Sequence, residues 1–160
     1  MSGKTRNLLG FFVCITITYA AAAIGGIFTG PAVNTWYPTL YLPPFTPPSW
    51  LFGPVWTILY GMMAIALFLV WRDKDNSRGR RTAFVIYAIQ LVLNAAWSPV
   101  FFGLKNPGAG LIIIILLWLA IAATINAFRG LSKTAALLLI PYLLWVSFAA
   151  VLNFAIWRLN

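Results

Sequence analysis

The sequence predicts an all-α integral membrane protein, built as a bundle of five transmembrane helices. Hydrophobic residues make up 62% of the chain and charged residues only 8%, whereas a soluble domain carries about 25% charged residues. Five apolar runs each have the roughly 20 residues that a helix needs to cross the hydrocarbon core of a bilayer. Most charged residues lie between these runs or at their ends. At 160 residues, the chain is expected to form a single membrane domain.

Proline and glycine mark the expected breaks between and within the spans. Gly30-Pro31 is expected to end the first span, Pro99 to kink the third, and Pro141 to bend the fifth. Ser49 is expected to cap the second span. The connection at residues 30–49, called the lid segment below, is rich in proline and aromatic residues and has no charge, which favours a stiff cover. The expected spans are residues 8–28, 50–71, 82–102, 108–128 and 134–157.

The first apolar run allows two interpretations. Ala21-Ala22-Ala23 is typical of a signal-peptide cleavage region, but the run continues well past these alanines, which favours an uncleaved first helix. Ala22, Gly26 and Gly30 lie at i, i+4 and i+8 and form a small-residue stripe. Such a stripe permits close helix packing, either inside one bundle or between two copies.

The net charge of +9 could suggest nucleic-acid binding, but the basic residues lie at the ends of apolar runs and not on one polar face. The topology of a membrane protein explains this placement better. With five spans, the N-terminus and the second and fourth loops lie on one side. Lys105 and Arg158 are the basic residues of the other side. The positive-inside rule therefore predicts a cytoplasmic N-terminus and an outward lid segment. The nine basic residues of the first side are Lys4, Arg6, Arg72, Lys74, Arg78, Arg80, Arg81, Arg129 and Lys133.

The chain has few residues able to carry acid–base or metal chemistry. It has no histidine, one cysteine and two acids, Asp73 and Asp75, which lie in a basic loop. The sequence therefore predicts no zinc site, no histidine ligand to haem iron and no carboxylate proton relay inside the membrane. No cofactor is expected to be required. Cys14 is expected to be a small buried hydrophobe, and no disulfide within the chain can form.

Polar and aromatic side chains inside the spans are the candidates for binding a ligand. One face of the third span carries Tyr87, Gln90, Asn94 and Trp97. One face of the fifth carries Tyr142, Trp145, Ala149 and Asn153, and the second span adds Trp56 and Tyr60. Two interpretations stay open: an aromatic cavity whose amides and phenols orient a ligand, or hydrogen bonds between helices together with ordinary ring packing. The convergence of several rings favours the cavity.

An ordered series of motifs runs through nearly the whole chain. It reads Trp36-Tyr37, Pro43-Pro44, Pro47-Pro48-x-Trp50, Pro54-Val-Trp56-Thr-x-x-Tyr60, Gln90-x-x-x-Asn94-x-x-Trp97-Ser-Pro-Val-Phe-Phe, Pro141-Tyr142-x-x-Trp145 and Leu152-Asn153-x-x-x-x-Arg158. This series resembles the tryptophan-rich sensory protein or translocator protein family (TspO), which includes the peripheral benzodiazepine receptor.

The resemblance implies a five-helix bundle, usually dimeric, with a ligand cavity beneath the first loop. It implies binding of porphyrins such as protoporphyrin IX and haem, of sterols, and of isoquinoline or benzodiazepine drugs. Asn94 matches the polar drug contact of the family, with Gln90 one turn before it. Phe154 stands where the sterol-recognition stretch of the family has tyrosine, which argues against high-affinity cholesterol binding. The expected ligand-binding residues are Trp36, Trp50, Trp56, Tyr60, Gln90, Asn94, Trp97, Tyr142, Trp145, Phe148, Ala149 and Leu152.

Four functions remain to be distinguished at this point. The first is a receptor or carrier with a sensory, regulatory or transport role in tetrapyrrole and stress metabolism. The alternative is a light-dependent porphyrin-degrading enzyme, whose tryptophans in the family match Trp56 and Trp145. A proton-coupled exporter is disfavoured by the lack of an intramembrane carboxylate, and a purely structural partner protein stays open. The expected location is a bacterial cell membrane, and the expected partners are a hydrophobic small molecule, the bilayer and a second copy of the chain, with no nucleic acid.

Overall fold

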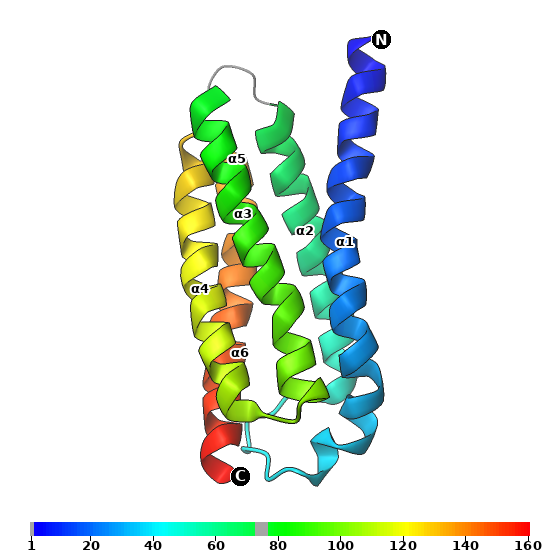
Figure 1. Cartoon of the computed structure of the whole chain (residues 1–160), viewed down its shortest axis with the longest axis vertical. Coiled ribbons are helices and arrows are strands. Elements are labelled where there is room, and N and C mark those ends of the chain that lie inside the picture. Colours follow the sequence, from blue (N-terminus) through cyan, green and yellow to red (C-terminus); the bar gives the residue numbers. More distant parts are fainter. Residues whose placement is uncertain (1, 73–76) are drawn as a thin grey trace.

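The computed structural model describes residues 2–72 and 77–160, and this part of the chain is helical and contains no strand (Figure 1). Five helical segments are long and apolar enough to span a membrane, so the predicted fold class is confirmed. The spans are α1 (Gly3–Thr35), α2 (Phe52–Arg72), α3 (Ser77–Ser98), α4 (Pro107–Arg129), and a fifth divided into α5 (Lys133–Leu138) and α6 (Ile140–Leu159). Three short elements join them: η1 (Tyr37–Thr39), η2 (Ser49–Leu51) and η3 (Pro99–Gly103).

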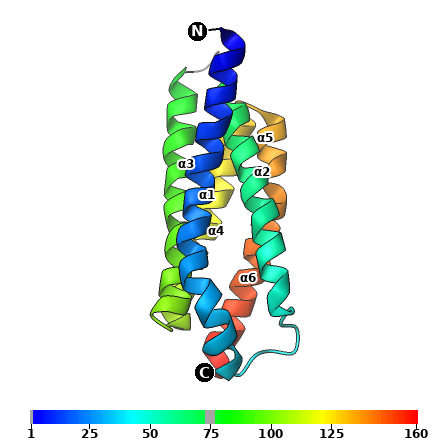
Figure 2. The same ribbon diagram turned by 90° about the vertical axis from the view of Figure 1, so that its right-hand side faces the viewer.

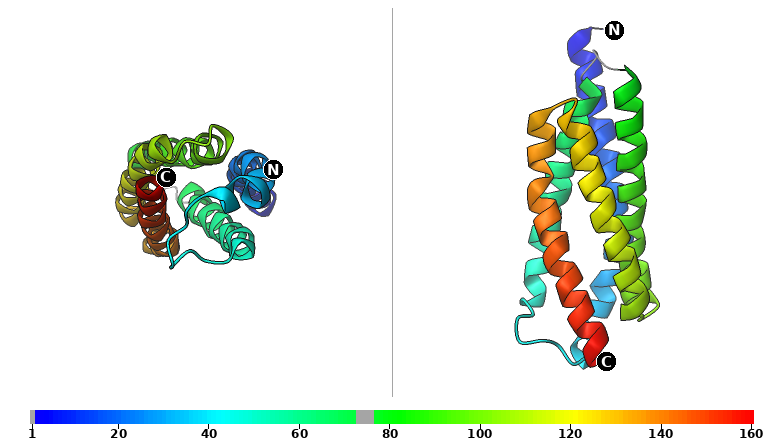
Figure 3. Two further views of the ribbon diagram at one scale, coloured as in Figure 1. Left: turned by 90° about the horizontal axis from the view of Figure 1, so that it is seen from below. Right: turned by 90° about the vertical axis from the view of Figure 1, so that its left-hand side faces the viewer.

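The helices stand side by side as an elongated bundle, with the two termini at opposite ends (Figure 1). Helix α1 packs against α2 and α3, α4 packs against α3 and α6, and α2 packs against α5. A view along the bundle shows this closed ring of helices and the lid segment crossing its C-terminal end (Figure 3). The lower halves of α2 and α6 spread apart, because α2 packs against α5 and is not closely packed against α6 (Figure 2).

Helix α1 is longer than the sequence predicts. Gly30-Pro31 does not end it, and the helix continues to Thr35. The Thr35 hydroxyl donates to the Pro31 carbonyl at 2.8 Å, and Ala32 is buried in an aromatic cluster. Membrane helices tolerate proline where neighbouring groups support the backbone. The first six residues of the lid segment, residues 30–35, are therefore helical.

The two other prolines break their helices near the expected places. From Pro99 the last turn of the third span widens into the π-helical η3, in which the Leu104 N–H donates to the Pro99 carbonyl at 2.9 Å. The fifth span is interrupted at Leu139, two residues before Pro141. Ser49 is not the residue before the second long helix, as expected of its cap, because it is the first residue of η2 and α2 begins only at Phe52.

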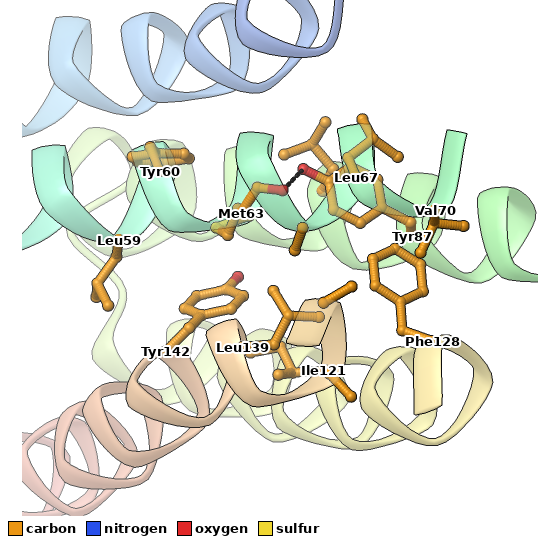
Figure 4. Close-up of a cluster of buried hydrophobic side chains, with 14 of the residues drawn as sticks. Leu59, Tyr60, Met63, Leu67, Val70, Tyr87, Ile121, Phe128, Leu139 and Tyr142 are labelled. Carbon is orange, nitrogen blue, oxygen red and sulfur yellow. Dashed lines mark hydrogen bonds between the residues drawn. The ribbon is translucent and has the colours of Figure 1, made fainter. Parts of the chain in front are cut away.

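Two hydrophobic clusters fill the bundle. The larger one joins α1–α5 and the start of α6, and Figure 4 shows part of it around Met63, Leu67 and Tyr87. The Tyr87 hydroxyl donates to the Met63 carbonyl at 3.5 Å. The smaller cluster closes the C-terminal end and consists of Ala32, Tyr37, Phe101, Phe102, Leu152 and Ile156. The two clusters leave a cavity toward the C-terminal end of the bundle.

The small-residue stripe on α1 does not pack as one unit against the bundle. Gly26 and Gly30 are exposed, and a Cβ added at either would meet nothing within 4 Å. The residues of α1 that face its neighbours are instead Gly10, Cys14, Thr18, Ala21, Gly25 and Ala32, which are all buried. The buried face is therefore offset from the stripe by roughly one residue around the helix.

Candidate ligand-binding site

A cavity of about 280 Å³ lies in the C-terminal half of the bundle, where α2 and α6 spread apart. Residues of α1, α2, α3 and α6 form its walls, and Ile114 and Leu117 of α4 close one side. Its lining is largely apolar and contains no charged side chain. Within the described residues, no three His, Cys, Asp or Glu side chains come together as a metal site. The site can therefore recognise shape, ring faces and a few polar atoms.

Aromatic rings from α1, η1, α2, α3, η3 and α6 contribute to the wall of the cavity. Trp56 of α2 lies 5.7 Å from Tyr60, centroid to centroid, and Trp97 of α3 stacks on Phe101 at 5.0 Å. Trp145 of α6 meets Phe52 edge to face at 6.2 Å. The wide turn after Pro99 explains why the adjacent residues Phe101 and Phe102 are both buried and both line the cavity.

A chain of hydrogen bonds runs behind the aromatic wall and joins α2, α3 and α6. The Tyr60 hydroxyl donates to Asn94 Oδ1, and Asn94 Nδ2 donates to the Tyr142 hydroxyl at 2.6 Å. The Tyr142 hydroxyl donates in turn to Gln90 Oε1 at 3.0 Å. All four residues are buried, so these bonds satisfy groups that the bilayer would not solvate. For Gln90 and Asn94, the structure shows the helix-joining bonds that the sequence left as one of two alternatives.

A second amide joins three helices at the lower edge of the cavity. The Trp97 indole Nε1 donates to Asn153 Oδ1 at 3.1 Å, and Asn153 Nδ2 donates to the Pro107 carbonyl at 2.7 Å. Gly110 on α4 permits this approach, because a Cβ there would lie 3.1 Å from Asn153 Oδ1 and 3.0 Å from the Phe101 ring. The Trp97 N–H is thereby engaged by the protein itself.

Two polar atoms of the cavity lining have no hydrogen-bond partner among the described residues. They are the Tyr37 hydroxyl and the Trp145 indole nitrogen, and both atoms are buried. Burial raises the pKa of Tyr37 to about 12, so its hydroxyl keeps its proton at neutral pH. Because buried polar groups are usually paired, a hydrogen-bond acceptor that reached either donor from the cavity would be stabilised there.

The sequence profile of the TspO/MBR family matches residues 12–158, which is almost the whole chain. The chain belongs to the TspO/MBR family. Its relatives include Tryptophan-rich protein TspO of Archaeoglobus fulgidus, 46% identical over 121 residues covering 74% of this chain and 76% of the relative. Protein CrtK of Rhodobacter capsulatus is 35% identical over 96% of this chain and 94% of its own. Human Translocator protein is 40% identical over 86% of this chain and 82% of its own.

The family resemblance predicted from the motifs is thus confirmed, and with it an integral, multi-pass membrane protein. Of the twelve residues expected to bind a ligand in this TspO/MBR protein, seven line the cavity. These seven are Trp56, Tyr60, Asn94, Trp97, Trp145, Ala149 and Leu152. Their role in binding stays a prediction.

The other five expected residues lie around the cavity and do not line it. Gln90 and Tyr142 are the far members of the hydrogen-bond chain behind the wall. Trp36 packs against Phe101 and Phe102, with ring centroids 5.8 and 6.3 Å apart, in the cluster below the cavity. The remaining two are Phe148, which contacts Trp145 and Phe45 of the lid segment, and Trp50, which is 71% exposed.

The wall contributed by α1 was not predicted. Tyr19, Ala22, Gly26 and Thr29 line the cavity and are spaced at i, i+3, i+7 and i+10, so they share one helical face. The small-residue stripe was the available signal, because two of its three residues, Ala22 and Gly26, line the cavity. Also missed were residues whose rings or backbone face the cavity only because of the irregular turns, above all Tyr37, Phe52 and Phe101.

Proposed function

We propose that this TspO/MBR protein is a membrane receptor or carrier for flat hydrophobic molecules with a hydrogen-bond acceptor, such as porphyrins, sterols and ring-containing drugs. The observation that carries the proposal is an uncharged cavity with many aromatic residues in its lining, two of which, Tyr37 and Trp145, also carry a buried donor without a partner among the described residues. A ring system would stack on the indole faces, and its carbonyl, carboxylate or ring nitrogen would accept from one of these donors.

The size of the cavity refines the class of ligand. A volume of about 280 Å³ lies near the lower limit of roughly 300 Å³ for small-molecule pockets. A drug-sized molecule fits with little change, whereas a porphyrin, which is broader, requires the lid segment to move or a part of the macrocycle to protrude. Because the lining is uncharged, porphyrin carboxylates would lie at the mouth. The names of the relatives, "Tryptophan-rich sensory protein" and "Translocator protein", agree with sensing or carrying a bound molecule.

The charge distribution supports the orientation proposed from the sequence. Helix ends at the N-terminal end of the bundle carry most of the described basic residues, and the opposite end carries Lys105 and Arg158. We place the N-terminus in the cytoplasm of a bacterial cell and the lid segment outside, by the positive-inside rule. The cavity then opens near the outer half of the membrane.

A titration of the purified protein with protoporphyrin IX in the dark tests the proposal. We expect saturable quenching of tryptophan fluorescence. Trp145→Phe should weaken binding roughly fivefold, because it removes one hydrogen bond of about 1 kcal/mol. Trp50→Phe is the matched control, since it makes the same change at an exposed indole outside the cavity. Equal affinity of the wild type and of a Trp56→Phe/Trp145→Phe variant would show that the ligand binds elsewhere.

One observation favours a second candidate, light-dependent degradation of a bound porphyrin. Trp56 and Trp145, from α2 and α6, line the same cavity, so a bound ring could contact both indoles. Such a reaction would require light and molecular oxygen, because the cavity offers no acid, base or metal ligand of its own. Illumination of the aerobic complex distinguishes the two functions: loss of the porphyrin absorption in wild type, but not in Trp145→Phe saturated with ligand, indicates the enzyme.

A further inference from the structure

We propose that the N-terminal end of the bundle holds a second site, which binds the phosphate group of an anionic lipid headgroup. A pocket of about 290 Å³ lies there between α1, α2 and α3, remote from the aromatic cavity. It is lined by Arg6, Asn7, Trp71, Arg72, Arg80 and Phe84. The proposal does not depend on the function assigned to the aromatic cavity.

The pocket gathers positive charge from three separate helices. Arg6 comes from the first turns of α1, Arg72 from the last residue of α2, and Arg80 from the first turn of α3. Arginine side chains from three helices that line one pocket offer an oxyanion several hydrogen-bond donors at once. Arginine also suits phosphate geometrically, because its planar fork donates two parallel hydrogen bonds to two oxygens.

The acids of the chain are too few to neutralise this end of the bundle. Asp73 and Asp75 are its only acids, and they lie outside the described residues. Nine basic residues belong to the same side of the bundle, so seven positive charges remain even if both acids are paired. An anion from outside the chain is therefore favoured at this end.

The base of the pocket is aromatic and held in place. The Trp71 indole lies across α1 at Gly10, where an added Cβ would be only 2.4 Å from the ring. Phe68 stacks on Trp71 at 6.0 Å with an angle of 20° between the planes. A packed indole beside arginines gives a surface that is apolar on one side and cationic on the other, as a headgroup joined to its glycerol and acyl chains requires.

The position of the pocket favours a lipid over a soluble phosphate as the source of the anion. Arg72 and Arg80 lie at the ends of apolar spans, where the headgroups of a bilayer lie. Basic pockets between transmembrane helices on the cytoplasmic side are known to accept anionic headgroups. A free phosphate shares the same chemistry, so the test must include both.

The test compares lipid binding by the full chain and by charge-matched variants. Protein in zwitterionic phosphatidylcholine is titrated with phosphatidylglycerol, and the retained lipid is counted by native mass spectrometry. We expect Arg6→Gln and Arg80→Gln each to weaken phosphatidylglycerol binding at least about fivefold, because each removes a charge-assisted hydrogen bond to the phosphate. Arg81→Gln removes the same charge from the exposed neighbour of Arg80, outside the pocket, and should change binding less than about twofold.

Three outcomes are informative. A fivefold loss in the pocket variants with the control unchanged, and no displacement by inorganic phosphate, supports the lipid site. An equal loss in Arg81→Gln overturns the proposal, because the attraction is then a diffuse field of charge. Binding of inorganic phosphate with no preference for phosphatidylglycerol overturns the lipid assignment. Circular dichroism of each variant checks that the helices are intact.

Discussion

The hydrogen bond from Tyr60 to Asn94 predicts a measurable coupling between two helices. Tyr60 is 6% exposed and Asn94 is 5% exposed, so both groups are largely shielded from bulk solvent and depend on each other for this hydrogen bond. In Asn94→Leu the Tyr60 hydroxyl loses its acceptor, and the Tyr142 hydroxyl loses a donor but keeps its bond to Gln90. An unsatisfied buried hydroxyl costs about 1–3 kcal/mol. We therefore expect Asn94→Leu to lower the free energy of unfolding by about 2 kcal/mol.

A double-mutant cycle with Tyr60→Phe and Asn94→Leu separates the energy of this hydrogen bond from the other effects of the two substitutions. Hydrogen bonds between membrane helices average about 0.6 kcal/mol and reach about 1.7 kcal/mol, because the unfolded chain in a membrane also finds partners. Both residues here are buried, so we expect Tyr60→Phe and Asn94→Leu to be coupled by about 1 kcal/mol. The assay is reversible unfolding of the ligand-free protein in mixed micelles with increasing dodecyl sulfate, followed by circular dichroism.

Tyr19→Phe is the matched control for this cycle. Its hydroxyl also lies beside the cavity, but it donates to the Thr57 carbonyl at 2.9 Å and does not bond Asn94. Its coupling to Asn94→Leu should be close to zero. If the Tyr60 cycle gives a value as small as the Tyr19 cycle, the hydrogen bond from Tyr60 to Asn94 does not hold α2 to α3, and the expected coupling is wrong.

Two further predictions concern the lid segment and its surroundings. The Asn160 side chain accepts from the Tyr41 N–H at 3.0 Å and donates to the Tyr41 carbonyl at 3.2 Å, so Asn160→Ala should loosen the lid and speed ligand dissociation, measurable by stopped-flow fluorescence. A dissociation rate equal to that of the wild type would show that other contacts hold the lid. Burial raises the pKa of Tyr37 to about 12 from a usual value of 10.0, so the folded state favours the phenol and its contribution to stability is lost as the pH rises from 10 to 12. At pH 11 this amounts to about 1 kcal/mol of unfolding free energy, and Tyr37→Phe should remove that part of the pH dependence.

The fold was predictable because the bilayer imposes it. Only long apolar helices satisfy their backbone inside hydrocarbon, so composition and run length were enough for five spans. The ends of the spans were less predictable. Gly30-Pro31 is typical of a helix end, yet α1 continues to Thr35. Ala32 is buried in a cluster with Phe101 and Phe102, which are far away in the sequence. That tertiary contact has no signal in the local sequence.

The cavity was predictable where a regular helical face forms it. Asn94 and Trp97 share a face of α3, and Trp145 and Ala149 share a face of α6, and all four line the cavity. Helical spacing failed where the backbone departs from an α-helix, because the π turn at η3 brings two consecutive phenylalanines inward. Helical spacing also could not distinguish Gln90 from Asn94, which share a face of α3. Asn94 lines the cavity, whereas Gln90 does not.

The hydrogen bonds divide the polar groups of the bundle by role. Inside a bilayer no water competes for a buried polar group, so the protein itself or a bound ligand must supply its partner. The Trp97 N–H is paired with Asn153, and Asn94 bonds both Tyr60 and Tyr142. The Trp145 N–H lines the same cavity without a partner among the described residues. Two tryptophans of similar setting thus differ in chemistry: Trp97→Phe should cost stability with or without ligand, whereas Trp145→Phe should cost little stability and mainly affinity. A large loss of stability in ligand-free Trp145→Phe would contradict this division, because it would mean that the Trp145 indole holds the bundle together as Trp97 does.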